Sequence, residues 1–194
     1  AGYAALTRPT MVWSISVPNY RRVFIPGGTW FFTVNLLERD RTLLVYHIGE
    51  LRHSIFRVKR RYPFRIEAMV VLPDHLHTIW TLPPGDSNFP LRWRLIRSAF
   101  SRTIPKDERR SEVRVRRSER GIWQRRYWEH AIRDQHYFNQ HVAYCYFNPV
   151  KHGYVSSPAA WAHSTFHRDV RCGRQQPDID QSLFANDPDF VGRD

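Results

Sequence analysis

The sequence predicts an α+β fold in which an antiparallel sheet is flanked by helices. Three segments have the aromatic and β-branched composition of strands: residues 29–36, 65–72 and 75–82. Only Pro73-Asp74 separates the last two. Between the first two, apolar residues recur at alternating intervals of four and three, which is the period of a helix. The resulting order, β-α-β-β-α-β-α, does not alternate strictly and therefore favours an antiparallel sheet over a doubly wound parallel one.

Two helices and a charged loop are predicted around the strand pair. The apolar residues between positions 44 and 58 share one helical face, and Pro63 marks the end of that helix. A basic helix spans roughly residues 89–103. Residues 102–120 contain eight Lys or Arg, four Asp or Glu and almost nothing apolar. This composition predicts a solvated, mobile loop.

The C-terminal third contains one more ordered segment and one more long helix. Order resumes at residues 122–130, where aromatic residues lie among arginines. Asp134 is a good N-cap for a helix that runs to about Phe147, and Pro149 is expected to stop it.

These elements predict one folded domain at residues 19–172. It is preceded by an N-terminal extension at 1–18 and followed by a tail at 173–194, where two arginines face five aspartates. One hypothesis is that this acidic tail occupies a nucleic-acid cleft when the nucleic acid is absent, because its carboxylates resemble phosphates.

The charge balance indicates a polyanionic partner. Thirty Lys and Arg against eighteen Asp and Glu give a net charge of +12 and a pI of about 10.4. Nucleic acid is the first expectation and an anionic membrane surface the second. No apolar run approaches the roughly 18 residues of a membrane span, and the N-terminus lacks a signal-peptide pattern, so we expect a cytoplasmic protein. Cys145 and Cys172 fit reduced thiols better than a disulfide framework or a zinc set.

A histidine pair is the first candidate for chemistry. His75 and His77 are two apart on a predicted strand, so both imidazoles project from one face while Leu76 points into the packing. Such a pair can hold a divalent metal. The alternative, half-exposed strand histidines, is the commoner one for the motif alone. Zinc hydrolases of this type have an Asp-His pair closely after the two histidines, and this chain does not. Barrel oxygenases need a carboxylate and a further His at strand spacing, which are also not found here.

A tyrosine and an asparagine form the second candidate. Tyr144 and Asn148 are four apart on a predicted helix and are therefore stacked neighbours. An amide oxygen suits a hard metal, and imidazoles broaden the choice from Mg²⁺ toward Mn²⁺. The alternative is a buried Tyr and an Asn that merely ends a helix.

Aromatic residues among basic ones form the third candidate, a surface for single-stranded nucleic acid. They occur at Tyr20-Arg21-Arg22, at 92–94 and at 123–128. The alternative for each is an amphipathic element with a Trp packed inward. A metal, a tyrosine and such a surface together indicate phosphoryl transfer through a covalent intermediate.

Five segments together resemble the REP-associated tyrosine transposases, relatives of the single-tyrosine insertion-sequence transposases. The resemblance covers roughly residues 19–170. These segments are 20–22, 27–36, 70–83 with His75-Leu76-His77, 123–130, and 144–154, which begins Tyr-Cys-Tyr-Phe-Asn-Pro. Residues 164–168 also resemble a later segment of that family.

The resemblance implies a ferredoxin-like fold with the His-hydrophobic-His motif on a central strand. It implies His75 and His77 as ligands of Mg²⁺ or Mn²⁺, and Tyr144 as a nucleophile that leaves a 5′-phosphotyrosine and allows strands to be rejoined. Relatives often have Gln as a third ligand where this chain has Asn148. Tyr146 is the competing nucleophile, but it points about 200° round the helix from Tyr144.

The implied partner is single-stranded DNA carrying hairpin repeats, without a nucleotide cofactor. We expect a monomer, with a dimer as the alternative. The predicted DNA contacts are Tyr20, Arg21, Arg22, Arg92, Arg94, Arg97, Arg125, Arg126 and Lys151.

Two other functions remain open at this point. One is a domesticated, non-catalytic protein that binds repeat DNA. The other is a metal-dependent RNA-processing nuclease that uses water as its nucleophile.

Overall fold

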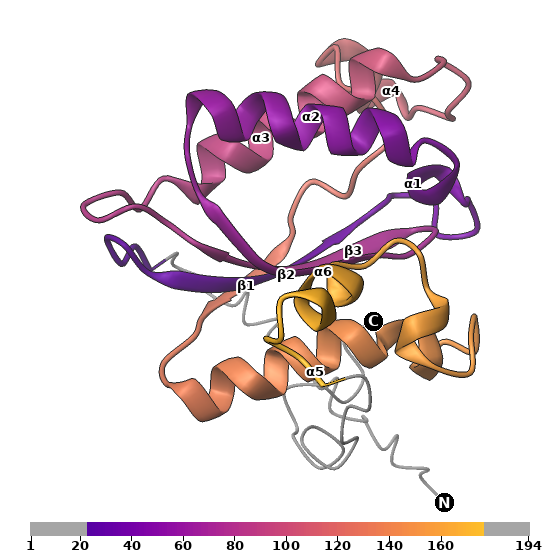
Figure 1. The fold of residues 1–194 in the computed structure, drawn as a ribbon. Helices are drawn as coiled ribbons and strands as arrows, with labels where there is room; N and C mark the ends of the chain where they lie inside the picture. The colour runs from indigo at the N-terminus through magenta and orange to yellow at the C-terminus, as the bar shows by residue number, and fades with distance from the viewer. Residues whose placement is uncertain (1–22, 177–194) are drawn as a thin grey trace, which may run out of the picture.

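The computed structural model describes residues 23–176. A four-stranded sheet separates two layers of helices, with α2 and α3 on one face and α5 on the other (Figure 1). The strands are β1 Thr29–Asn35, β2 Arg65–Val71, β3 His75–Thr81 and β4 Trp128–Ala131. The helices are α1 Leu43–Tyr46, α2 Ile48–Arg61, α3 Phe89–Thr103, α4 Glu112–Arg116, α5 Gln135–Lys151, the 3₁₀ helix η1 Pro158–Ala160 and α6 Phe166–Arg171.

The sheet is antiparallel throughout, in the order β2-β3-β1-β4. With β-α-β-β-α-β connectivity this is the ferredoxin-like arrangement, and the predicted α+β class is confirmed. β3, which carries the histidine pair, lies in the interior of the sheet. Its register with β1 pairs His77 with Thr33 and Leu76 with Val34, so residues on the two strands share faces.

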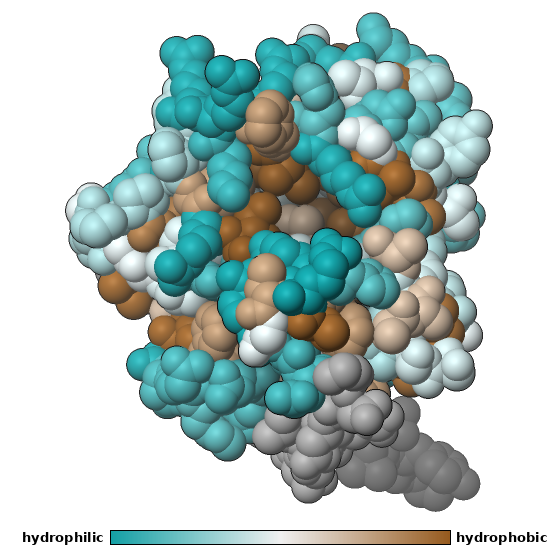
Figure 2. Space-filling model, viewed as in Figure 1, coloured by the Kyte–Doolittle hydropathy of each residue, from teal (hydrophilic) through white to brown (hydrophobic). Residues whose placement is uncertain are grey.

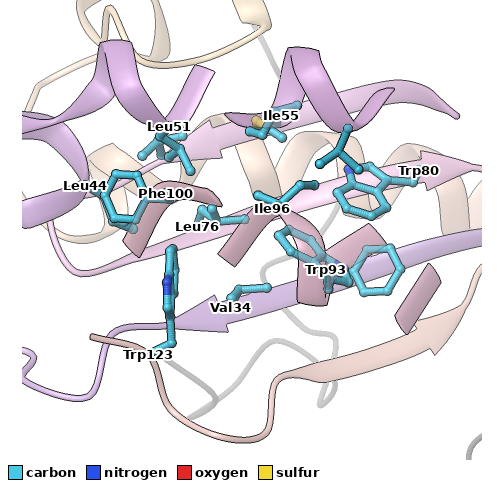
Figure 3. Packing of buried hydrophobic residues seen from close by; sticks show 14 of the residues in the cluster. Val34, Leu44, Leu51, Ile55, Leu76, Trp80, Trp93, Ile96, Phe100 and Trp123 are labelled. Atoms are coloured by element: carbon cyan, nitrogen blue, oxygen red, sulfur yellow. The ribbon is translucent and has the colours of Figure 1, made fainter. Parts of the chain in front are cut away.

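The face toward α2 and α3 is a dense apolar core (Figure 3). Trp80 of β3 stacks on Trp93 of α3, with ring centroids 4.2 Å apart, and both side chains are fully buried. Leu76 projects into the same core. Of the two interpretations open for Trp93, the structure selects inward packing, so Trp93 is not a platform for a nucleic-acid base.

Two predicted helix boundaries differ from the structure. The helix expected from Leu44 to Val58 is interrupted at His47, which separates α1 from α2. Pro149 does not stop α5, which continues to Lys151.

The actual stop of α5 is Gly153, whose φ of +71° lies in the left-handed region. There the Gly153 and Tyr154 N–H groups donate to the Val150 and Pro149 carbonyls, which is the Schellman pattern. Burial of the last turns of α5 against the sheet offsets the one hydrogen bond that Pro149 cannot make.

The segment 102–120 is mostly exposed, as its composition predicts, but it is not an irregular loop throughout. It contains α4, and Arg120 forms an ion pair with Glu108, whose side chain is 2% exposed. Arg120 also donates to the Ser101 and Pro105 carbonyls. These bonds satisfy a buried carboxylate and fasten the segment to the end of α3.

The edge strand β2 is covered by a short segment before α6. Val71 donates to the His163 carbonyl, and Thr165 donates to the Met69 carbonyl. This pairing satisfies backbone groups that would otherwise form an open sheet edge. Figure 2 shows a hollow beside it, with hydrophobic residues at its floor below α2.

Candidate active site

The two histidines of β3 lie together on the face toward α5. Strand alternation turns Leu76 into the opposite core and leaves both imidazoles on this side. His75 is 1% exposed and His77 0%, and their ring centroids are 4.9 Å apart.

Each ring is oriented through its Nδ1 atom. His75 Nδ1 lies 2.7 Å from Asp74 Oδ1, and His77 Nδ1 lies 2.9 Å from Thr33 Oγ1. An ionised carboxylate only accepts hydrogen bonds, so His75 must donate through Nδ1, and its Nε2 carries a lone pair when the ring is neutral. A histidine held in this way is set up to bind a metal through the other nitrogen. Asp74 and Thr33 were not singled out as site residues from the sequence.

Asp74 stays ionised despite its burial. Burial by itself raises the pKa of its carboxyl group, but hydrogen bonds from His75 and Arg39 outweigh that effect and lower the pKa to about 2. Arg39 Nε lies 2.5 Å from Asp74 Oδ2. The only sequence signal for this support was an Asp directly before the histidine pair, and nothing in the sequence indicated Arg39.

Tyr144 of α5 lies against the histidine pair. Its ring centroid is 5.1 Å from that of His77, and the Lys151 ammonium lies over its ring at 5.3 Å from the centroid. The side chain is 3% exposed. A phenol and a positive charge therefore adjoin two imidazoles on one face of the sheet.

Asn148 lies between two helical neighbours that both touch the pair. One turn before it, Tyr144 contacts His77. One turn after it, His152 contacts His75, with ring centroids 5.2 Å apart. Because positions four apart are stacked on a helix, the Asn148 amide faces the same space. His152 is a neighbour of the site that the sequence reasoning did not assign.

The donor atoms present fit a metal ion. His75 Nε2 and both polar atoms of the Asn148 amide are buried without a hydrogen-bond partner among the described residues. Such atoms are costly unless something else satisfies them. Within residues 23–176 no three His, Cys, Asp or Glu side chains form a metal-binding cluster. A third protein ligand would therefore have to be of another type, which Asn148 provides.

Tyr146, the competing tyrosine, is engaged elsewhere. Its hydroxyl donates to Asp169 of α6 and lies 3.2 Å from Thr165 Oγ1. Burial, and next the bond to Asp169, raise the pKa of its phenol. It is thus a poor nucleophile and a structural link between α5 and α6.

The predicted DNA-binding residues lie in different surroundings. Arg94, Arg97 and Arg125 line one large cavity beside α3. Arg126 is exposed. Tyr20, Arg21 and Arg22 lie outside the described residues, as does most of the acidic tail.

The predicted DNA contact of Arg92 is wrong, because its side chain is buried and cannot reach DNA. Its side chain is 2% exposed, and its Nη2 lies 2.6 Å from Asp86 Oδ2. Its guanidinium also donates to the Pro63, Tyr62 and Asn88 carbonyls. All of these bonds hold the start of α3 in place, and the hydrogen bond from Arg92 lowers the pKa of Asp86.

Comparison with known proteins identifies the family. No protein-family model matches the sequence. The REP-associated tyrosine transposase of Escherichia coli K12 is 50% identical over 154 residues, which cover 79% of this chain and 86% of that protein. The chain belongs to this family. A Haemophilus influenzae protein assigned to the same family is 44% identical over 79% of this chain and 88% of its own length.

A solved structure of a REP-associated tyrosine transposase bound to a REP hairpin has the same fold. Its TM-score is 0.74 at 48% identity, over 84% of this chain and 92% of that one. This member of the family therefore shares both the sheet and the helices around it. None of the helices among residues 23–176 has the length and apolar character needed to cross a bilayer.

Proposed function

We propose that this REP-associated tyrosine transposase cuts single-stranded DNA at hairpin-forming repeats and becomes covalently attached to the cut end through Tyr144. The observation that carries the proposal is the contact between Tyr144 and a buried, oriented histidine pair. A nucleophile next to a metal-binding set is the arrangement that covalent phosphoryl transfer requires.

His75, His77 and Asn148 would hold the metal, Mg²⁺ or Mn²⁺. When bound, the ion supplies positive charge that withdraws electron density from a non-bridging oxygen of the scissile phosphate. Asp74 and Thr33 keep the imidazoles in place for this role. Asn148 is shorter than the Gln of relatives, and its unsatisfied amide supports its inclusion.

Tyr144 performs the bond exchange. As its Oη loses a proton and forms a bond to the phosphorus, the bond to the 3′ oxygen breaks and that oxygen takes up a proton, which leaves a 5′-phosphotyrosine and a free 3′-OH. One phosphoester replaces another, so no nucleotide cofactor is needed and a 3′-OH can reverse the step. The Lys151 ammonium, which lies over the Tyr144 ring, would stabilise negative charge that develops on the phenol.

The proposed substrate is inferred from the net charge of the chain and from the ligand of a solved relative. A solved relative is bound to a REP hairpin, and the net charge of +12 in this chain suits a nucleic acid. We infer the same class of partner here.

The test is a covalent-adduct assay. Wild-type protein, Tyr144→Phe, His75→Ala and the control Tyr146→Phe are incubated with Mn²⁺ or Mg²⁺ and labelled single-stranded DNA carrying hairpin repeats. The products are separated on a denaturing protein gel. A metal-dependent labelled protein band should appear for wild type and Tyr146→Phe and be absent from the other two variants.

The remaining outcomes separate the alternatives. Cleaved DNA without a labelled protein band, persisting in Tyr144→Phe, would establish a water nucleophile. Binding of every hairpin without cleavage would establish a DNA-binding protein that is not a nuclease.

A further inference from the structure

Two further histidines meet on the face of the sheet toward α5. His130 lies on β4 and His141 on the first half of α5, and their Nε2 atoms are 2.6 Å apart. His141 is 0% exposed. Neither residue belongs to the proposed metal ligands, and neither was a predicted site residue. The fold therefore buries a second pair of imidazoles for which the metal site gives no reason.

A backbone carbonyl fixes the hydrogen-bonding roles within this pair. His141 Nδ1 lies 2.7 Å from the Tyr137 carbonyl oxygen, which can only accept, so His141 donates there. The other nitrogen of a neutral His141 then carries a lone pair, and His130 donates to it through Nε2. Both ring nitrogens of His141 are engaged, which holds the ring between its own helix and β4.

The pair shares a packing neighbour with Tyr144 and His77. Phe31 of β1 is buried, and its ring centroid lies 5.4 Å from that of His130 and 4.9 Å from that of His141. The same centroid lies 5.6 Å from that of His77 and 6.0 Å from that of Tyr144. A continuous layer of packed rings therefore joins the His130–His141 bond to the proposed nucleophile.

Helix geometry makes the position of Tyr144 depend on that of His141. The two residues are three apart on α5, so their side chains leave the helix axis about 60° from each other. A rotation of the helix about its axis moves both together. Because a tyrosine hydroxyl lies far from the axis, a rotation of about 10° shifts it by roughly 1 Å. Misplacement of that size can slow a reaction on the order of 100-fold.

A hydrogen bond controls such a rotation better than apolar packing does. Apolar contact has no preferred direction, whereas a hydrogen bond weakens steeply as its angle departs from linear. The connection between β4 and α5 is short, residues 132–134, so β4 already fixes where the helix begins. The bond from His130 to His141 adds a second attachment about two turns further along the helix.

We propose that the hydrogen bond between His130 and His141 sets the rotation of α5 and thereby places the Tyr144 hydroxyl for attack on the phosphate. The two histidines are positioning residues, because they act through the helix and through Phe31. This inference rests on the proposed function for the reaction that Tyr144 performs. It deepens that function by giving a role to β4, which contributes neither a proposed ligand nor the nucleophile.

The test compares two amide replacements of His130 in the full-length protein. Gln places an N–H donor near the position of Nε2 and can retain the bond to His141, whereas the shorter Asn cannot reach it. Covalent adduct formation is measured in a single turnover at saturating DNA and Mn²⁺, below the unfolding transition of every variant. His130→Asn should react on the order of 100-fold more slowly than wild type, and His130→Gln should retain most of the rate.

Tyr146→Phe is the matched control, because it also removes a buried hydrogen bond of α5, on the side toward α6. Its adduct rate should match the wild type. Affinities for Mn²⁺ by calorimetry and for hairpin DNA by fluorescence anisotropy should be the same in His130→Asn and wild type. A slower rate with unchanged affinities is the result expected when only the nucleophile is misplaced.

A double-mutant cycle tests whether both histidines act through one bond. His141→Asn keeps a donor near the Tyr137 carbonyl but loses the acceptor for His130. The double variant His130→Asn/His141→Asn should be no slower than the slower single variant, since the second change removes a bond that is already lost.

A second measurement does not depend on catalysis. In protein labelled with fluorotyrosine, the fluorine resonance of Tyr144 is assigned by its absence from Tyr144→Phe. His130→Asn should shift or broaden this resonance, and His130→Gln should leave it near its wild-type position. The Tyr146 resonance should stay unchanged in both variants.

Four results would overturn the inference: equal adduct rates in His130→Asn and His130→Gln, a parallel loss of Mn²⁺ affinity, additive losses in the double variant, or an unchanged Tyr144 resonance in His130→Asn. Failure of the wild type to form any adduct would refute the nuclease proposal instead. The Tyr144 resonance would then still decide whether the histidine pair positions this side chain.

Discussion

The two faces of the sheet differ in what their buried side chains do. Toward α2 and α3 the strands contribute aromatic and aliphatic residues to a continuous core, with Trp80 stacked on Trp93. Toward α5 the same strands bury histidines, and the helix brings a tyrosine and an asparagine against them. The first face stabilises the fold mainly by removing apolar area from water. The second buries His75 Nε2 and the Asn148 amide, which have no hydrogen-bond partner among the described residues.

This division explains how a small domain can tolerate a polar interior. The cost of burying His75 Nε2 and the Asn148 amide falls on the α5 face alone, while the opposite core remains intact. Substitutions on the two faces should therefore separate stability from activity. The predictions below test that separation, from the largest expected effect to the smallest.

Replacement of His75 by Ala should remove cleavage almost completely. Loss of an outer partner of a metal ligand typically costs about 10–100-fold, so loss of a ligand should cost more. Cleavage rates at saturating Mn²⁺ measure the effect, and His53→Ala, an exposed histidine on α2, is the matched control. Wild-type rates in His75→Ala would show that this face does not carry the chemistry.

Replacement of Trp93 by Ala should destabilise the protein by about 3–5 kcal/mol, because it opens a cavity in the apolar core. The free energy of unfolding in urea is the measurement, and Trp93→Phe should cost less. Below the unfolding transition, Trp93→Ala should still form the Tyr144 adduct. Loss of the adduct in a variant that remains folded would break the division between the faces.

Replacement of Asp74 by Ala should weaken Mn²⁺ binding about 10–100-fold, because the His75 ring would lose the carboxylate that orients it. Calorimetric titration of Mn²⁺ measures this, with Asp40→Ala as an exposed carboxylate control. Unchanged affinity would mean that Asp74 serves only to anchor Arg39.

Replacement of Tyr146 by Phe should cost about 1–1.5 kcal/mol of stability and leave the adduct intact. Burial raises the pKa of Asp169, but the hydrogen bonds from Arg168, Tyr146 and Arg174 outweigh it and lower the pKa. The stability from this shift is present above the unfolded pKa of about 3.9 and is lost as the pH falls below it.

Without the Tyr146 hydroxyl the shift should shrink, so stability should fall less steeply below about pH 4 than in the wild type. Urea unfolding midpoints between pH 3 and pH 7 provide the comparison. If the stability of both proteins fell identically below about pH 4, Asp169 would not be the source of that fall.

Much of the fold could be predicted from the sequence because the signals were local. Strand composition, helical periodicity and the Asp134 N-cap located the main elements, and Asp134 accepts from the Tyr137 N–H as expected. The errors at Pro149 and in residues 102–120 have one cause. Local composition disfavoured order there, and long-range contacts imposed it. These are the burial of α5 against the sheet and the ion pair of Arg120 with Glu108.

The candidate site was predictable only in part, for the same reason. Strand alternation placed His75 and His77 on one face, and helical spacing placed Tyr144 beside Asn148. No local pattern indicated that Thr33 would orient His77, because that bond joins residues 44 apart in the sequence.

The sequence by itself determined the class of fold, the candidate residues for metal binding and for nucleophilic attack, and the net positive charge, since each depends on residue type and short-range spacing. Only the tertiary structure decided which of several similar residues could act. It buried Arg92 against Asp86, engaged Tyr146 with Asp169, and gathered six arginines from three segments into one groove. Burial and long-range pairing control which charges and hydroxyls remain accessible, and both arise only when distant segments pack together.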